Sequence, residues 1–212
     1  MDKNKRVLIF DFDGTLVDSM GRLTQIASEV MTEHFNITPK EARHLYQQTS
    51  GLAFPDQLAT LYPDCAVVNK KAADLFQRKK KAGYFQEKVF DDTYDTIQYL
   101  KAKGYTVVIS SNSEQELVEK FVAQLKIPCD LALGYRENFA KGMPHFLYIL
   151  KRFGVELRSV VFIGDSLKDL ERAEECGVDF IGKEGMFSAK DFRKNHPDLP
   201  VISALADLKK IF

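Results

Sequence analysis

The sequence has no net charge and no long apolar segment. Lysine plus arginine and aspartate plus glutamate each number 30 among its 212 residues. A balanced chain lacks the overall positive field with which proteins attract nucleic acids or anionic membranes. No apolar run approaches the roughly 20 residues that a membrane-spanning helix needs. The composition therefore predicts a soluble protein with neither nucleic acid nor a membrane as its partner.

Cysteine is also scarce, and its placement argues against disulfides and zinc. The three cysteines are odd in number and far apart: Cys65, Cys129 and Cys176. Unpaired, scattered thiols are typical of a reducing compartment, and this spacing does not fit a zinc site. The first apolar run, Val7–Phe10, is too short for a signal peptide and leads directly into an acidic motif. We therefore expect a cytoplasmic location.

The remaining composition is sufficient for a folded core, with 45% hydrophobic and 28% charged residues. Short β-branched runs alternate with helix-like segments, which predicts an α/β fold with a parallel sheet and crossover helices. The predicted strands are Val7–Phe10, Thr106–Ser110, Leu131–Leu133, Val160–Ile163 and Asp179–Ile181, with a weak strand around Val201.

The stretch between the first two predicted strands has only helix signals. Apolar residues spaced by three and four follow Ser19, a possible cap, and Thr38–Glu41 forms a capping box with proline at its first helical position. We therefore expect a helical domain over residues 17–88, inserted into an α/β core of residues 1–16 and 89–212.

An acidic motif directly follows the first predicted strand. Asp11 and Asp13 are two positions apart, so on an extended chain both carboxylates point the same way. At about 4 Å and an effective dielectric near 20, their repulsion is on the order of 4 kcal/mol. A cation or a shared proton relieves such repulsion. Gly14 then permits a sharp turn close to a ligand.

Polar residues also follow two other predicted strands. Gly164-Asp165-Ser166-Leu167-Lys168-Asp169 comes after one, and Ser110-Ser111-Asn112-Ser113 after another. Parallel strands deliver their carboxyl ends to one edge of the sheet, where α/β proteins bind ligands. Three strand ends therefore converge on one expected site. Ser113–Glu116 also has the pattern of a capping box that opens a helix.

With these motifs in order, the sequence resembles the haloacid dehalogenase superfamily of phosphohydrolases over nearly its whole length. Asp11–Thr15, Ser111, Lys141 and Gly164–Asp169 match the four motifs of that family. The resemblance implies a Rossmann-like three-layer parallel-sheet core with an inserted helical cap, as in phosphoglycolate phosphatases. It implies a phosphatase that uses Mg²⁺, an ion that prefers hard oxygen ligands.

The resemblance also implies a role for each matched residue. Asp11 would be the nucleophile that forms an aspartyl-phosphate, and Asp13 the acid and then the base for proton transfer. Asp11, Asp13 (through its backbone carbonyl) and Asp165 would hold the metal, with Asp169 as an auxiliary acidic residue behind them.

The phosphate would be bound by Ser111, by the backbone of Asn112 and by Lys141, whose positive charge lies close to the nucleophile. The family pattern around this lysine is Lys-Pro-x-Pro, and here Gly142 replaces the first proline. Thr15 would hydrogen-bond near Asp13 and steady it.

A helical cap that closes over a site excludes water and selects the leaving group. We therefore expect a small phosphorylated metabolite as substrate, similar to phosphoglycolate or a sugar phosphate. A phosphomutase is less favoured because Leu23 stands where those enzymes carry a cap histidine. A phosphonate hydrolase and a non-catalytic phosphate-binding protein remain alternatives, and monomer and homodimer are both open.

Overall fold

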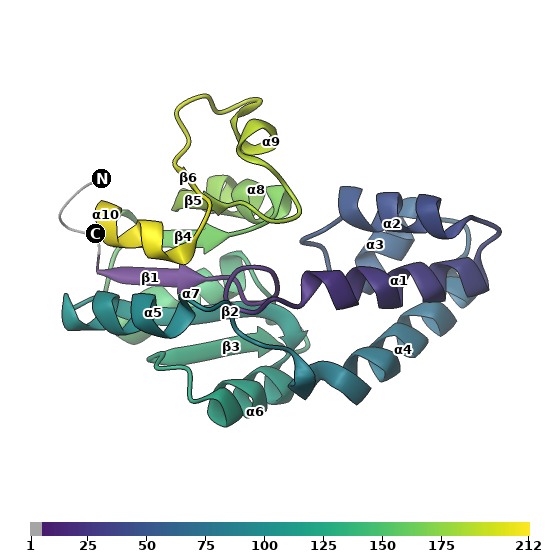
Figure 1. Ribbon diagram of the computed structural model, residues 1–212, viewed down its shortest axis with the longest axis horizontal. Helices are drawn as coiled ribbons and strands as arrows, with labels where there is room; N and C mark the ends of the chain where they lie inside the picture. The colour runs from purple at the N-terminus through teal and green to yellow at the C-terminus, as the bar shows by residue number, and fades with distance from the viewer. Residues whose placement is uncertain (1–5) are drawn as a thin grey trace. The chain divides into compact units, whose positions relative to one another are not determined.

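The computed structural model describes residues 6–212, which divide into two compact units. One unit comprises the residues up to Asp18 together with Val89–Phe212, and the other is Ser19–Lys88. Figure 1 labels the elements of both. No described helix is both long enough and apolar enough to cross a membrane.

The unit Ser19–Lys88 is entirely helical. Its elements are α1 (Met20–His34), α2 (Pro39–Gln48), α3 (Phe54–Leu61), α4 (Ala66–Gly83) and a 3₁₀ turn, η1 (Tyr84–Gln86). The capping box that opens α2 is present, because the Thr38 side chain accepts from the Glu41 amide and the Glu41 side chain accepts from the Thr38 amide. Phe54 stacks on Phe76 with ring centroids 4.1 Å apart, so this unit has an apolar core of its own.

The other unit is built on a six-stranded sheet in which every neighbouring pair is parallel, in the order β3-β2-β1-β4-β5-β6. The strands are β1 (Val7–Phe10), β2 (Thr106–Glu114), β3 (Leu131–Tyr135), β4 (Val160–Gly164), β5 (Asp179–Lys183) and β6 (Val201–Ile202). The first strand therefore lies between β2 and β4, so the residues after these three strands emerge side by side at the carboxyl edge.

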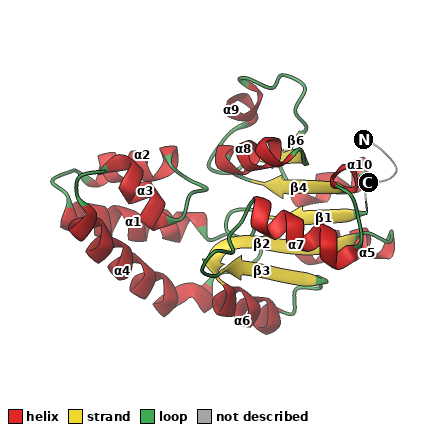
Figure 2. Ribbon diagram, turned by 180° about the vertical axis from the view of Figure 1, so that it is seen from behind, coloured by secondary structure: helices red, strands yellow, loops and turns green. Residues whose placement is uncertain are grey.

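Helices cover both faces of this sheet, giving three layers (Figures 1 and 2). One face carries α7 (Met143–Phe153), α8 (Leu167–Cys176) and α9 (Ala189–Arg193). The other carries α5 (Thr93–Ala102), α6 (Gln115–Leu125) and α10 (Leu208–Ile211). Short 3₁₀ turns precede β4 and α10, namely η2 (Leu157–Ser159) and η3 (Leu205–Asp207).

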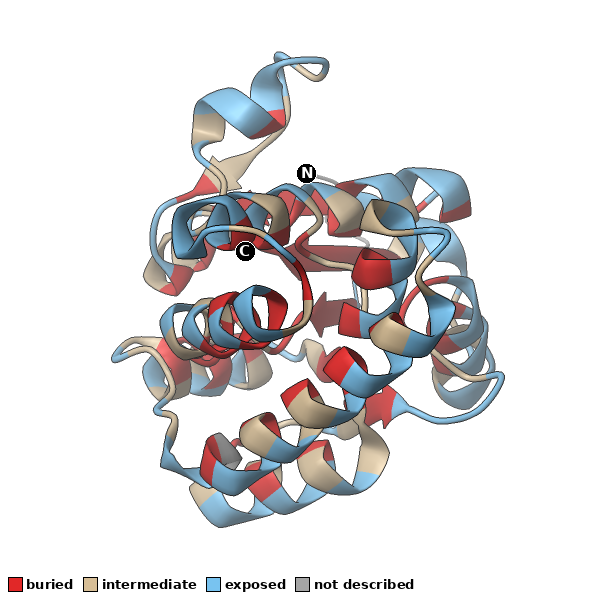
Figure 3. Ribbon diagram, turned by 90° about the vertical axis from the view of Figure 1, so that its right-hand side faces the viewer, coloured by how far each residue is buried: buried red, intermediate tan, exposed pale blue. Residues whose placement is uncertain are grey.

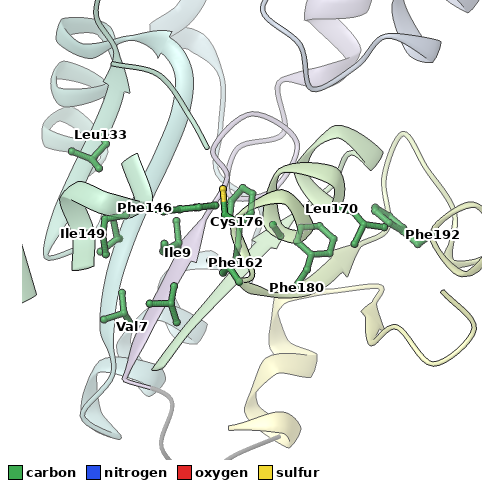
Figure 4. Packing of buried hydrophobic residues seen from close by; sticks show 14 residues of the cluster. Val7, Ile9, Leu133, Phe146, Ile149, Phe162, Leu170, Cys176, Phe180 and Phe192 are labelled. Carbon is green, nitrogen blue, oxygen red and sulfur yellow. The ribbon is translucent and has the colours of Figure 1, made fainter. Parts of the chain in front are cut away.

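Side chains alternate between the two faces along β1. Val7 and Ile9 belong to the core cluster shown in Figure 4, where Phe146 of α7 and Phe162 of β4 meet edge to face at 5.4 Å. All four residues of β1 are fully buried, and Figure 3 shows buried positions on both strands and helices. A central strand buried on both faces is expected in a parallel sheet. The buried strand β1 therefore holds the residues that follow its carboxyl end in a fixed position.

The predicted α/β fold class with helices inserted after the first strand is confirmed. One local prediction is wrong: Ser113 does not cap a helix, because β2 continues through it to Glu114 and α6 begins at Gln115. Pairing of Glu114 with Tyr135 of β3 holds this extension in the sheet, so a tertiary contact outweighs the local capping pattern.

Candidate active site

Asp11 occupies the first position after β1, at the carboxyl edge of the sheet. Its amide donates to the carbonyl of Ile163 at 2.8 Å, which continues the pairing with β4 by one residue. The chain then turns at Gly14, whose φ of +86° lies in the left-handed region that favours glycine. Asp11 as a whole residue is only 4% exposed, so a carboxylate is held inside the protein.

Lys141 reaches this carboxylate from a segment 130 residues away. Its Nζ lies 2.6 Å from Asp11 Oδ1 and 2.8 Å from Asp169 Oδ1. All three side chains are buried, so the ion pairs are formed in a medium of low dielectric. The structure thus brings together three of the residues that the sequence predicts for the site.

Asp169 is held by several further contacts. It lies in the first turn of α8, where the Ser166 hydroxyl accepts from its amide at 3.1 Å and donates to its Oδ2 at 2.6 Å. Arg172 approaches its Oδ1 at 3.4 Å. A Cβ at position 164 would lie 2.8 Å from the Asp169 Cβ, so glycine there permits the close approach of this carboxylate to β4.

Asp165, one residue beyond β4, completes an acidic cluster. Carboxylate oxygens of Asp11, Asp165 and Asp169 lie within 4.8 Å of one another. Asp165 Oδ2 is buried without a hydrogen-bond partner among the described residues. Three hard oxygen donors, one of them unsatisfied, fit a Mg²⁺ ion. Because Lys141, Arg172 and Ser166 already contact the Asp169 oxygens, Asp165 with its unpartnered Oδ2 is better placed than Asp169 to be a direct ligand.

The protonation equilibria reflect this crowding. Burial raises the pKa of Asp11 to about 6, although Lys141 acts in the opposite direction. Burial also holds the pKa of Asp165 well above its usual range, and the nearby charges of Asp11 and Asp169 raise it further. For Lys141, burial alone would lower the pKa, but Asp11 and Asp169 hold it above its ordinary value. The site therefore has an excess of negative groups that a divalent cation would neutralise.

Asp13 points to a different partner. Its Oδ2 accepts a hydrogen bond of 2.9 Å from the Ser113 hydroxyl, and the Ser113 amide donates to Ser111 Oγ at 3.0 Å. The carboxyl ends of β1 and β2 are thereby joined through side chains of both. Ser111 is buried and Asn112 is half-buried, at the end of β2 where the sequence analysis expects the phosphate-binding residues.

Two further positions refine the expectations. The Thr15 hydroxyl donates to Asp11 Oδ2 at 3.4 Å, so it contacts the expected nucleophile and not Asp13, near which it was predicted to lie. Gly142 has φ of +115° and ψ of −144°, a conformation that proline cannot adopt. The departure from Lys-Pro-x-Pro therefore accompanies a different backbone path beside Lys141.

Two buried residues near the site were missed by the sequence analysis. His145 Nδ1 lies 2.8 Å from Ser110 Oγ, which links α7 to the middle of β2. Lys183 is the last residue of β5 and donates to the carbonyl of Gly14 at 3.2 Å. A lysine at the carboxyl end of a predicted apolar strand was a usable signal, because parallel strands deliver such residues to the ligand-binding edge.

Comparison with known proteins assigns the family. The family model for haloacid dehalogenase-like hydrolases matches residues 8–183. A probable phosphatase, IndB, from Dickeya dadantii is 30% identical over 193 residues, covering 84% of this chain and 80% of the relative. A phosphoglycolate phosphatase from Aliivibrio fischeri is 23% identical over 190 residues, covering 84% of this chain and 83% of the relative.

Solved structures agree with this assignment. A putative haloacid dehalogenase-like hydrolase from Bacteroides fragilis is 25% identical, covers 96% of this chain and 99% of its own, and has a TM-score of 0.81. A predicted phosphatase from Clostridium acetobutylicum shares the fold, with a TM-score of 0.83 at 21% identity and 98% coverage of each chain. The prediction of a haloacid dehalogenase-type phosphatase is confirmed, and the chain belongs to the haloacid dehalogenase-like hydrolase family.

Proposed function

We propose that this phosphatase is a magnesium-dependent phosphomonoester hydrolase that works through an aspartyl-phosphate on Asp11. One observation carries the proposal: a buried Asp11 carboxylate lies 2.6 Å from the Lys141 ammonium and within 4.8 Å of oxygens of Asp165 and Asp169. A nucleophile for a phosphoryl group needs positive charge beside it, since both reactants are anionic.

In the proposed reaction, an Asp11 carboxylate oxygen attacks phosphorus and the bond to the ester oxygen breaks. Asp13 gives its proton to the departing alkoxide, so the alcohol leaves neutral. A water molecule then attacks phosphorus, Asp13 takes the proton of that water, and phosphate leaves with Asp11 restored. The 2.9 Å hydrogen bond from Ser113 fixes one oxygen of Asp13 and so orients the carboxyl group for both transfers.

Asp11, Asp165 and the backbone carbonyl of Asp13 would hold Mg²⁺. When bound, the ion supplies positive charge that offsets the repulsion between the nucleophile and the phosphate. Lys141, Ser111 and the backbone of Asn112 would bind the phosphoryl oxygens. Asp169 would keep Lys141 in place through the 2.8 Å ion pair.

The substrate is proposed to be a small phosphorylated metabolite, such as phosphoglycolate or a sugar phosphate. Relatives that carry the name phosphoglycolate phosphatase support this choice. We further propose that residues 17–88 serve as a cap that selects the leaving group, and that residues 1–16 and 89–212 form the catalytic core. A cytoplasmic location is proposed from the scarce, unpaired cysteines.

The test is phosphate release from a panel of phosphorylated metabolites with and without Mg²⁺, ranked by kcat/KM. Asp11→Asn should lower kcat by at least about 10³-fold, because an amide is a poor nucleophile for phosphorus. Asp179→Asn is the matched control, since this exposed aspartate begins β5 at the opposite edge of the sheet. Acid-quenched wild-type enzyme should gain one phosphoryl group in mass, and Asp11→Asn should not.

A wild-type protein that releases no phosphate from any substrate in the panel would contradict the proposed function. Full activity in Asp11→Asn would place the nucleophile at another residue.

A further inference from the structure

Lys183 is a buried cation that the proposed chemistry does not use. It is 4% exposed, at the carboxyl end of β5. Its Nζ donates to the carbonyl oxygens of Gly14 at 3.2 Å and Glu184 at 3.3 Å, and lies 3.9 Å from the centroid of the Phe90 ring. Two carbonyl oxygens and the face of one aromatic ring thus surround a single ammonium group, which has three N–H donors.

Burying this ammonium is costly. Removing a cation from water costs several kcal/mol unless other groups replace its hydration. Among residues 6–212, the hydrogen bonds of Lys183 go to two backbone carbonyls and not to a carboxylate. Burial accordingly lowers its pKa, while the more distant charges of Asp165, Asp92 and Asp18 act in the opposite direction. An apolar side chain would fill the end of β5 without this cost, so simple packing does not account for a lysine.

The Gly14 carbonyl is the informative contact. It belongs to the peptide that connects Gly14 to Thr15, and the Thr15 hydroxyl donates to Asp11 Oδ2 at 3.4 Å. Gly14 is the most freely rotating residue of this turn, because it has no side chain and a φ of +86°. A donor that holds its carbonyl therefore restricts the turn on which Asp11, Asp13 and Thr15 are carried.

The Phe90 ring connects Lys183 to a second segment. The Phe90 amide donates to the carbonyl of Leu16 at 3.1 Å, and Val17 forms an antiparallel bridge with Val89. These paired residues lie in two segments of the α/β unit, one that ends just before Ser19 and one that begins just after Lys88. Lys183 thus contacts both the turn that carries the acidic motif and the chain returning to the core.

We propose that Lys183 is a positioning residue that fixes the Asp13-Gly14-Thr15 turn against β5 and Phe90, and thereby holds Asp11 in its reactive orientation. The effect on turnover rests on the proposed function, whereas the restriction of the turn does not. Lys183 acts through Gly14 and Thr15 and has no contact with the reacting atoms in this role.

The experiment compares Lys183→Met and Lys183→Gln with Lys190→Met. Methionine keeps most of the length of the side chain and removes the ammonium, and glutamine is a second, polar replacement should the first fail to fold. Lys190 is an exposed lysine of α9 and serves as the matched control. Hydrogen exchange of the Leu16, Val17 and Phe90 amides is measured in metal-free protein, well below the unfolding midpoint of each variant.

Both Lys183 variants should exchange these three amides about 10-fold or more faster than wild type, as expected if a contact worth roughly one hydrogen bond is lost. Their kcat should fall about 10- to 100-fold with KM within about 2-fold, the pattern of a displaced nucleophile with intact substrate binding. Lys190→Met should match wild type in both measurements.

Several results would overturn the proposal. Exchange and kcat equal to those of Lys190→Met, with only a lower unfolding temperature, would make Lys183 merely structural. Faster exchange with unchanged kcat would show that the restricted turn does not position Asp11. If wild-type protein has no phosphatase activity, the proposed function fails, and the exchange measurement still decides whether Lys183 restricts the turn.

Discussion

His145 provides a prediction whose magnitude follows from the structure. Its side chain is fully buried on α7, packs against the Phe139 ring with centroids 4.5 Å apart, and has Nδ1 2.8 Å from Ser110 Oγ. Burial lowers the pKa of His145 to about 4, and the positive charges of Lys141, Arg136 and Arg172 act in the same direction. The folded protein therefore keeps this imidazole neutral at pH values where the unfolded chain binds a proton.

The sign of the effect follows from proton linkage. Between about pH 6.5, the value for an unfolded chain, and the folded pKa of about 4, the unfolded state binds more protons at this histidine. Stability through His145 is therefore complete above about pH 6.5 and decreases as the pH falls. Lowering the pH from about 7.5 to about 5 should reduce the free energy of unfolding by about 2 kcal/mol through this residue alone.

Asp11 acts in the opposite direction over part of this range. Its folded pKa of about 6 exceeds the unfolded value, so its protonation favours the folded state as the pH falls from about 6. The wild-type pH profile therefore contains both effects, and a single curve cannot separate them. A variant that lacks only the titrating imidazole isolates the contribution of His145.

His145→Asn is the suitable variant, because its amide can occupy the place of Nδ1 beside Ser110 and does not titrate. Urea unfolding of the metal-free proteins, followed by circular dichroism because the chain has no tryptophan, gives the free energy at both pH values. The variant should lose about 2 kcal/mol less than wild type on acidification. His44→Asn, at an exposed position of α2, should behave as wild type. Parallel pH profiles for wild type and His145→Asn, within about 0.5 kcal/mol, would refute the reasoning.

Two further predictions concern the site. Gly142→Pro restores the family pattern, yet it should lower the unfolding temperature by several degrees and reduce kcat, because proline cannot adopt a φ of +115° beside Lys141. Thermal unfolding and a phosphatase assay of the variant test this prediction. A raised unfolding temperature would contradict it. In wild type, Mg²⁺ at about 100 times its dissociation constant should add about 2.7 kcal/mol of stability. Asp165→Asn should abolish that gain, because it removes a ligand with an unsatisfied oxygen, and it should not destabilise the metal-free protein, because it relieves the repulsion from Asp11 and Asp169. Calorimetric unfolding with and without Mg²⁺ measures both effects, and a Mg²⁺ response equal to that of wild type would exclude Asp165 as a ligand.

The sequence alone was sufficient for the local elements of the fold. The strand that leads into Asp11 and the capping box at Thr38 depend on residues a few positions apart, and the structure has both. Asp11 and Asp165 were predicted to meet because each directly follows an apolar strand, and parallel strands end at the same edge. Such predictions need only the spacing of apolar residues along the sequence and the parallel direction of the strands.

Tertiary structure alone decided how the polar groups that come from distant segments pair in the site. Lys141 reaches Asp11 across 130 residues, and Ser113 serves Asp13 because pairing with β3 extends the strand past a local helix-capping pattern. The contacts of Lys183 with Gly14 and Phe90 likewise join segments that are distant in the sequence. The sequence thus determined which chemical groups arrive at the edge of the sheet. Their pairing follows from strand order and burial, which depend on long-range packing that no local pattern encodes.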